Sequence, residues 1–197
     1  MADEVGLPLY RYIGGTGPFS LPVPMMNVIN GGAHANNGLD IQEFMLVPTG
    51  FTSFKEALRA GCEIFHTLKT ILDQKSCSTA VGDEGGFAPQ LANHKLALEL
   101  MLEATEQAGY HAGKEIFFAM DCAASEFYQN GVYNFVSEQR SFDAAQLTDY
   151  LTNLLEQFPI ISIEDGMAEN DHQGWQLLTQ RSVSYTHLRA HETGRNL

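Results

Sequence analysis

Short apolar runs recur along the chain, separated by longer amphipathic stretches. Residues 22–28 and 42–48 are apolar and bounded by Gly, Asn and Pro, which predicts two buried strands. Residues 116–120 and 160–163 have the same character, and Pro159 separates the second of these from the helix expected before it. The pattern therefore predicts strands that alternate with helices, as in an α/β protein.

The longer stretches carry helix start and stop signals. Ser53 with Glu56 has the spacing of a capping box, and a second helix is predicted from Asn93 to a glycine cap at Gly109. The first helix is expected to bury one apolar face: Phe54, Leu58, Cys62, Phe65, Leu68 and Leu72. The second is expected to bury Leu96, Leu100, Ala104 and Ala108.

Later elements follow the same logic. A third helix is predicted from Leu147 to Phe158, and Asp171 is expected to cap a final helix. Asn130-Gly131, between aromatic-rich flanks, predicts a β-hairpin inserted after the third strand.

Acidic residues stand beside the apolar runs at near-even intervals of 41, 37 and 43 residues: Glu43, Glu84, Asp121 and Glu164. A strand–helix–strand unit needs about 30 residues or more. In a parallel barrel the C-terminal strand ends meet at one face, which carries the active site. We therefore predict an α/β barrel with its acids at one rim, where a divalent cation relieves their mutual repulsion.

Length limits this prediction to part of a barrel. The 197 residues hold four or five such units, whereas a closed barrel has eight and typically about 250 residues. The composition, 44% apolar and 18% charged, is that of a globular protein. We expect an incomplete TIM barrel.

Net charge and cysteine content narrow the expected binding partners and cellular location. A net charge of −13 disfavours nucleic acid and favours a cation. No apolar run approaches the roughly 18 residues of a membrane span. The start of the chain lacks the pattern of a secretion signal, and three cysteines without metal-type spacing are expected to be free thiols. A cytoplasmic location is predicted.

The glycine-flanked acids of Gly82-Asp83-Glu84-Gly85-Gly86 are the first candidate for chemistry. Glycines let the backbone turn sharply and approach a ligand, so Glu84 is a candidate proton donor. An ordinary solvated turn is the alternative, although such turns rarely need three glycines.

Asp121 and Glu164 each follow a strand and precede small residues, which suits oxygen ligands for Mg²⁺. A single acid at the end of a strand more often caps the next helix. Because such acids recur along this chain, we favour the interpretation that Asp121 and Glu164 bind a metal ion. Their neighbours Glu126 and Asp165 are expected to cap or hydrogen-bond and are left out of the site. His34, in a polar loop before Gln42 and Glu43, is a candidate for binding an anionic group or moving a proton. Because successive side chains of a strand point to opposite faces, only one of Gln42 and Glu43 is expected to point inward.

Together these motifs resemble the enolase family, the phosphopyruvate hydratases, from Leu7 to about Arg181. Five segments carry the resemblance in the family's order: Pro22 to His34, Asp40 to Phe44, Val81 to Gly86, Ala119 to Glu126 and Ser162 to Gly166. The resemblance implies an enolase-type barrel and a Mg²⁺-dependent lyase of glycolysis that interconverts 2-phosphoglycerate and phosphoenolpyruvate.

The resemblance also implies roles for individual residues. Glu84 corresponds to the general acid that protonates the departing hydroxide, and Glu43 assists near that hydroxyl. Asp121 and Glu164 correspond to two Mg²⁺ ligands. The substrate, a phosphorylated carboxylate, is contacted by His34, Gln42 and Glu43. The family further implies a homodimer for the full-length protein and allows a cell-surface form.

Parts of the family's pattern are absent from the sequence. We expect residues 1–20 to be a remnant of an N-terminal domain with its linker, residues 21–181 a partial barrel, and residues 182–197 a non-native tail. The family's lysine base and third metal ligand belong to later strands, so this chain is expected to be inactive alone. The alternatives are a non-enzymatic fragment or surface binding module, and another barrel enzyme of the superfamily, which is disfavoured because those enzymes place lysines on early strands.

Overall fold

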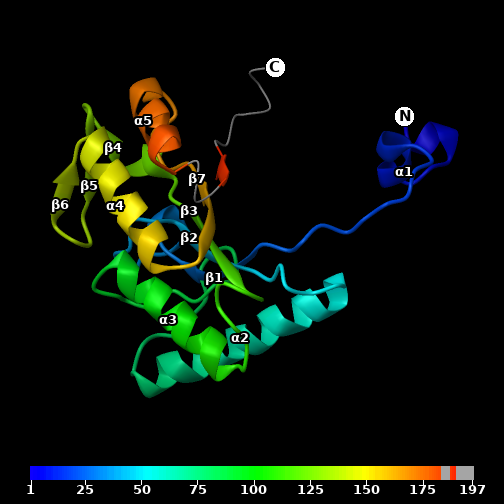
Figure 1. The fold of residues 1–197 in the computed structure, drawn as a ribbon, viewed down its shortest axis with the longest axis horizontal. Coiled ribbons are helices and arrows are strands. Elements are labelled where there is room, and N and C mark those ends of the chain that lie inside the picture. The colour runs from blue at the N-terminus through cyan, green and yellow to red at the C-terminus, as the bar shows by residue number, and fades with distance from the viewer. Residues whose placement is uncertain (183–186, 190–197) are drawn as a thin grey trace.

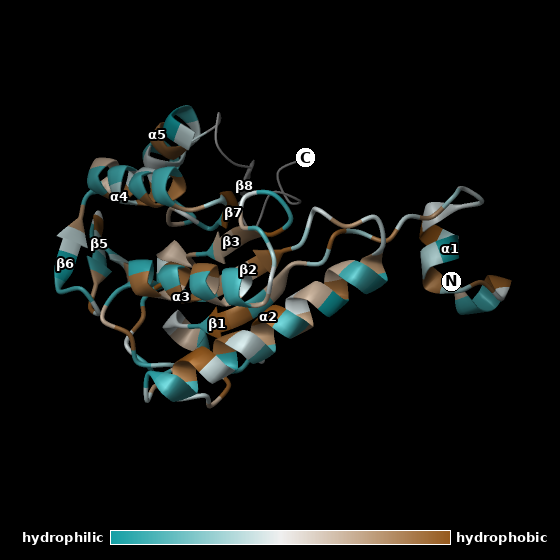
Figure 2. Cartoon of the chain, turned by 60° about the horizontal axis from the view of Figure 1, so that its bottom comes forward, coloured by the Kyte–Doolittle hydropathy of each residue, from teal (hydrophilic) through white to brown (hydrophobic). Residues whose placement is uncertain are grey.

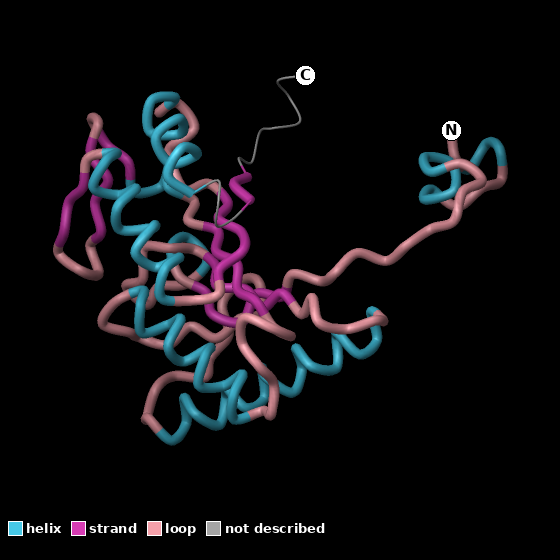
Figure 3. The backbone as a smooth tube through the Cα atoms, viewed as in Figure 1, coloured by secondary structure: helices cyan, strands magenta, loops and turns pink. Residues whose placement is uncertain are grey.

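The computed structural model describes residues 1–182 and 187–189, and its centre is an open sheet (Figures 1 and 3). The strand order is β1-β2-β3-β7-β8. The strands are β1 (Met26–Asn30), β2 (Glu43–Val47), β3 (Phe117–Asp121), β7 (Ile160–Glu164) and β8 (His187–Arg189). The sheet of the described residues does not close, which confirms the prediction of a partial α/β barrel.

The expectation that all strands run parallel is wrong for β2. It pairs antiparallel with both β1 and β3, whereas β3, β7 and β8 are parallel. The β1–β2 connection contains only a short 3-10 turn, η2 (Gly32–His34), and no crossover helix. Two helices separate β2 from β3. The connection therefore returns the chain to the end of the sheet where β2 finished, and β3 runs in the opposite direction.

Strand β1 starts later than the apolar run suggests. The run begins at Pro22, but pairing begins at Met26. Pro22 and Pro24 have no N–H to donate to a strand ladder, which explains the shift.

Four helices follow the predicted order: α2 (Phe54–Gln74), α3 (His94–Gln107), α4 (Ala144–Gln157) and α5 (His172–Ser182). The predicted caps at Asn93 and Asp171 and the Ser53 half of the predicted capping box are confirmed, because each side chain accepts a backbone N–H in the first turn. The Glu56 half of that box is not formed, since the Glu56 carboxylate binds Arg59 instead. The capping box of α4, formed by Asp143 with Gln146, was not predicted.

The buried face of α2 differs from the predicted one. Its buried residues are Ala57, Ala60, Gly61, Ile64, Leu68, Ile71 and Leu72. Leu58 is 42% exposed and Cys62 is exposed. In the first half of the helix this face consists of small residues, and a Cβ on Gly61 would overlap the side chain of Met26. The backbone of α2 approaches Met26 closely, so the buried face is rotated from the one that apolar spacing alone predicts.

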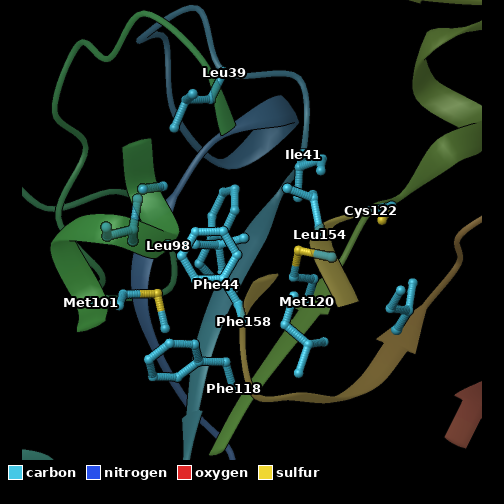
Figure 4. Packing of buried hydrophobic residues seen from close by; sticks show 14 of the residues in the cluster. Leu39, Ile41, Phe44, Leu98, Met101, Phe118, Met120, Cys122, Leu154 and Phe158 are labelled. Carbon is cyan, nitrogen blue, oxygen red and sulfur yellow. The ribbon is translucent and has the colours of Figure 1, made fainter. Parts of the chain in front are cut away.

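The main core lies between one face of the sheet and helices α2, α3 and α4. Figure 4 shows Phe44, Phe118 and Met120 on neighbouring strands beside Met101 of α3. A smaller cluster of Met45, Val47 and Ala119 lies on the opposite face of the sheet. The central strands are the most continuously apolar part of the chain in Figure 2.

Two further parts lie outside the main sheet. The predicted hairpin is confirmed and belongs to a three-stranded sheet of β4 (Tyr128–Gln129), β5 (Val132–Phe135) and β6 (Arg140–Phe142). It follows the short 3-10 helix η3 (Ala124–Phe127). Asn130 and Gly131 take φ angles of 53° and 84°, as a type I′ turn requires.

At the N-terminus, η1 (Asp3–Val5) and α1 (Leu9–Gly14) lie apart from the sheet on an extended segment (Figure 1). The predicted boundaries at residues 20 and 181 stay predictions, and most of the predicted tail lies outside the described residues. Among the described residues, no helix combines the length and apolarity that crossing a membrane requires.

Candidate active site

One row of residues crosses the sheet at a single rim. Asn30 is the register partner of Glu43, Glu43 of Asp121, and Asp121 of Glu164. We call these four residues the rim row. Neighbouring strands lie about 4.8 Å apart and register partners point to the same face. The structure therefore brings three of the predicted acids together.

Strand reversal is what places Glu43 in this row. Glu43 is the first residue of β2, whereas Asp121 and Glu164 are the last residues of β3 and β7. In a fully parallel sheet, the start of a strand would lie at the opposite rim. Because β2 is antiparallel, its start meets the ends of its neighbours.

The glycine-rich loop brings Glu84 to the same place. Phe87 donates its N–H to Val28 O at 2.9 Å, and Asn30 donates its N–H to Phe87 O at 2.8 Å, so the loop is tied to the free edge of β1. The turn is closed by the bond from Gly82 N–H to Gly86 O at 2.8 Å. Gly85 takes a φ of 81°, a left-handed conformation that favours glycine.

Glu43 is the electrostatic centre of the site. Burial, a hydrogen bond with Glu84, and the nearby charges of Glu84, Asp121 and Glu164 raise the pKa of Glu43 to about 8. His34 places Nδ1 3.4 Å from Glu43 Oε1, beyond ideal hydrogen-bond distance. One donor atom each from His34, Glu43 and Glu84 lie within 4.8 Å of one another.

Two neighbouring donor sets could hold a cation. The set of His34, Glu43 and Glu84 includes an imidazole nitrogen, which suits zinc and similar metals better than magnesium. The pair Asp121 and Glu164 offers only oxygen, the donor that Mg²⁺ prefers. Burial is the main cause of the raised pKa of Glu43, and the negative charges of its neighbours, which a cation at this pair would offset, add to it. The rim row therefore fits Mg²⁺.

The loops after β3 and β7 are locked to each other. Cys122 donates its N–H to Glu164 O at 2.9 Å, and Ala124 donates its N–H to Asp165 O at 2.9 Å. Asp121 Oδ1 accepts the N–H of Ala123 at 2.9 Å. Ala123 and Asp165 take φ angles of 46° and 47°, which cost about 1–2 kcal/mol each for non-glycine residues. Strain at both candidate ligand loops is typical of functional sites.

Gln42 lies just before β2 and is half-buried. Its carbonyl accepts the N–H of Gly31 at 2.8 Å, and its own N–H donates to Asp121 O at 3.1 Å. These bonds fix its backbone beside the rim row. That Gln42 and His34 contact a substrate stays a prediction.

A buried hydrogen-bond network around His94, beneath the segment that precedes Gln42, was not predicted. His94 is fully buried, and its Nε2 accepts the N–H groups of Asp40 at 3.0 Å and Ile41 at 3.3 Å. Nε2 is therefore an acceptor and the ring proton lies on Nδ1, 3.0 Å from Glu138 Oε1. Burial alone would raise the pKa of Glu138, but hydrogen bonds from His94 and Tyr150 outweigh it and lower the pKa to about 2.

This network holds the segment that leads into Gln42 and Glu43. The carboxylate of Asp40 accepts the N–H of Val136 at 2.8 Å, which ties the segment to the hairpin sheet as well. The sequence around His94, at the start of a predicted helix, does not indicate that it joins a buried network, because its partners Glu138 and Tyr150 lie 44 and 56 residues away. Only the fold brings them together.

Comparison with known families agrees with this geometry. The sequence model of "Enolase, C-terminal TIM barrel domain" matches residues 18–188. The match spans the rim row, the glycine-rich loop and all helices from α2 to α5. The chain belongs to the enolase family, through its C-terminal TIM barrel domain.

Proposed function

We propose that this chain supplies the metal-binding and proton-donating part of a phosphopyruvate hydratase, which interconverts 2-phosphoglycerate with phosphoenolpyruvate and water. Membership of the family supports a lyase of the enolase superfamily. The observation that carries the finer proposal is the rim row, in which Glu43 meets Asp121 and Glu164 while Glu84 hydrogen-bonds to Glu43.

The proton-donating step falls to the Glu43–Glu84 pair. Hydroxide is a poor leaving group and needs a proton as it departs. With a pKa raised to about 8, Glu43 retains a proton at neutral pH before any cation binds, and the hydrogen bond lets it share that proton with Glu84. Glu84 is exposed and therefore open to a substrate. A placed general acid contributes roughly 10²–10⁴-fold in rate.

Asp121 and Glu164 would hold Mg²⁺. When bound, the ion would supply positive charge that stabilises a doubly negative enolate of the substrate, as enolase-superfamily sites do with one or two Mg²⁺ ions. His34 and Gln42 would orient the substrate beside this charge. The acidic rim cannot bind a phosphorylated carboxylate well without such a cation, because like charges repel.

The base that removes the substrate proton is not among the lysines of this sequence. All five lie on α2, on α3 or in the loops after α2 and before β3: Lys55, Lys69, Lys75, Lys95 and Lys114. Lys75 and Lys95 form ion pairs with Glu103 and Glu99 of α3, and Lys114 precedes β3 at the end opposite Asp121. We propose that the chain alone has no lyase activity, and that the longer protein acts in the cytoplasm as a homodimer.

Turnover of 2-phosphoglycerate tests the proposal. In a protein that contains this sequence within a completed barrel, Glu84→Gln should lower kcat by about 10²–10⁴-fold. Glu169→Gln, which removes an exposed acid near the same end of β7, should leave kcat unchanged. Full activity of Glu84→Gln, or measurable turnover by the 197-residue chain, would contradict the proposal.

A further inference from the structure

We infer that Asn30 is a positioning residue that sets the orientation of Glu84. Asn30 belongs to the rim row but carries no charge and is fully buried. It ends β1, directly beneath the glycine-rich loop. The inference rests on the proposed function, because it assigns Asn30 a role only through the proton-donating Glu84.

The side-chain amide of Asn30 binds the backbone of the two acids themselves. Its oxygen accepts the N–H groups of Asp83 and Glu84, each at 3.2 Å, and its nitrogen faces the amide of Asn27. The opposite orientation would direct two N–H groups at the Asn30 nitrogen. When the Asn27 amide is turned as well, its Oδ1, otherwise buried without a hydrogen-bond partner among the described residues, accepts from the Asn30 nitrogen; this replaces the bond from Asn27 Nδ2 to the Asn30 oxygen. The network therefore fixes the orientation of the amide.

Both backbone groups of Asn30 are hydrogen-bonded, like its side chain. Its N–H donates to Phe87 O at 2.8 Å, and its carbonyl accepts Asn37 Nδ2 at 2.8 Å. Asn37 also donates to Pro89 O at 3.0 Å. Asn30 thus connects the end of β1, the loop after it and both sides of the glycine-rich turn.

The glycines on either side of the acids fit closely around this amide. A Cβ on Gly82 or on Gly86 would overlap side-chain atoms of Asn30. In contrast, a Cβ on Gly85 would meet no atom within 4 Å. Two of the three glycines are therefore required by the close approach of Asn30, which links the motif around Glu84 to the end of β1.

The two acids differ in how much they depend on Asn30. The N–H of Asp83 also donates to His34 O at 3.2 Å, so it keeps a partner if the amide is removed. For the N–H of Glu84, Asn30 is the acceptor that the described residues provide. Loss of the amide should therefore release Glu84 more than Asp83.

Amide hydrogen exchange of the 197-residue chain, resolved by NMR, tests this difference. Asn30→Ala should speed exchange at Glu84 by about fivefold, because a hydrogen bond contributes about 1 kcal/mol and 1.4 kcal/mol is tenfold. Asp83 should change less, and Gly85, bonded to Gly82 O at 3.1 Å, should not change. Asn30→Asp, whose carboxylate still accepts both N–H groups, should restore most of the protection.

Asn37→Ala is the matched control, because it loosens the same loops without removing the amide beneath Glu84. Unchanged exchange at Glu84 in Asn30→Ala would overturn the inference. So would an equal acceleration at the core amide of Phe118, which would mark Asn30 as merely structural. If Asn30→Ala does not fold, Asn30→Leu, which has nearly the shape of asparagine but no acceptor, carries the same expectations.

Turnover in the completed protein separates this inference from the proposed function. Asn30→Ala should lower kcat at least tenfold with little change in KM. If Glu84→Gln lowers kcat but Asn30→Ala does not, the positioning role is wrong. If Glu84→Gln retains full turnover, the proposed function fails, while the exchange result still shows whether Asn30 holds the loop.

Discussion

Glu43 and Asp121 are register partners across an antiparallel strand pair, although one begins its strand and the other ends its strand. The meeting depends on the reversed direction of β2. It adds a third carboxylate to the two that parallel β3 and β7 place side by side. This concentration of negative charge favours a cation, and it adds to burial, the larger cause, in raising the pKa of Glu43.

Stability in the absence of divalent cations should depend on Glu43. The folded carboxyl keeps its proton up to about pH 8, whereas the unfolded one releases it near 4.5. Folding therefore takes up a proton in this window, and stability should fall as pH rises through it. Urea denaturation in EDTA at several pH values should show this loss in the natural chain and much less of it in Glu43→Gln.

Other buried groups do not obscure that comparison. Burial alone would lower the pKa of His94, but hydrogen bonds with Asp40 and Glu138 outweigh burial and raise the pKa of His94, and this affects the natural chain and Glu43→Gln alike. The pKa values of Asp40 and Glu138 are lowered, so their contributions are complete above their ordinary values and are lost only in more acidic solution. A parallel loss of stability in the natural chain and in Glu43→Gln would contradict the raised pKa.

Gly82→Ala should disturb the glycine-rich loop. The new Cβ would overlap the Asn30 amide and the carbonyl of His34, both held by neighbouring bonds. Overpacking of this kind costs about 1–3 kcal/mol. Gly17→Ala, where a Cβ meets nothing within 4 Å, is the control and should cost less than 1 kcal/mol in thermal or urea unfolding. Equal stabilities of the two variants would show that the loop does not pack as described.

His94→Ala should be among the more destabilising single changes. It leaves Glu138 and the N–H groups of Asp40 and Ile41 without their shared partner, at about 1–3 kcal/mol for each buried group that finds no substitute. His111, whose side chain is 73% exposed beside Glu115, gives the comparison. His111→Ala should change the free energy of unfolding by no more than about 0.5 kcal/mol. A cost for His94→Ala as small as that would contradict the buried network.

Local signals predicted much of this fold. Caps at Ser53 and Asn93 depend on residues three positions apart, and the Asn130-Gly131 turn depends on two adjacent residues. Such features are visible in sequence because the interacting groups are neighbours. The order of elements follows for the same reason.

Features that depend on distant contacts were missed or wrong. The reversal of β2 follows from how two helices return the chain, and the turned face of α2 follows from its close approach to Met26. The partners of His94 and the role of Asn30 depend on segments more than 40 residues apart. The acids themselves were found because each stands beside an apolar run, a local signal of a shared rim.

Paramagnetic mapping with Mn²⁺, which accepts the same oxygen ligands as Mg²⁺, tests most directly whether the acids converge on one cation. Titrated into the isotopically labelled chain, Mn²⁺ should broaden the amide resonances of Glu43, Glu84, Asp121 and Glu164 together, and Mg²⁺ should compete with it. The amides of Val47 and Phe117, about 14 Å away at the other end of β2 and β3, should broaden only at higher Mn²⁺ concentration, because the effect falls steeply with distance. Asp121→Asn should abolish the effect. Broadening confined to exposed acids of the helices, or spread evenly over both ends of the sheet, would contradict a single cation site at the rim row.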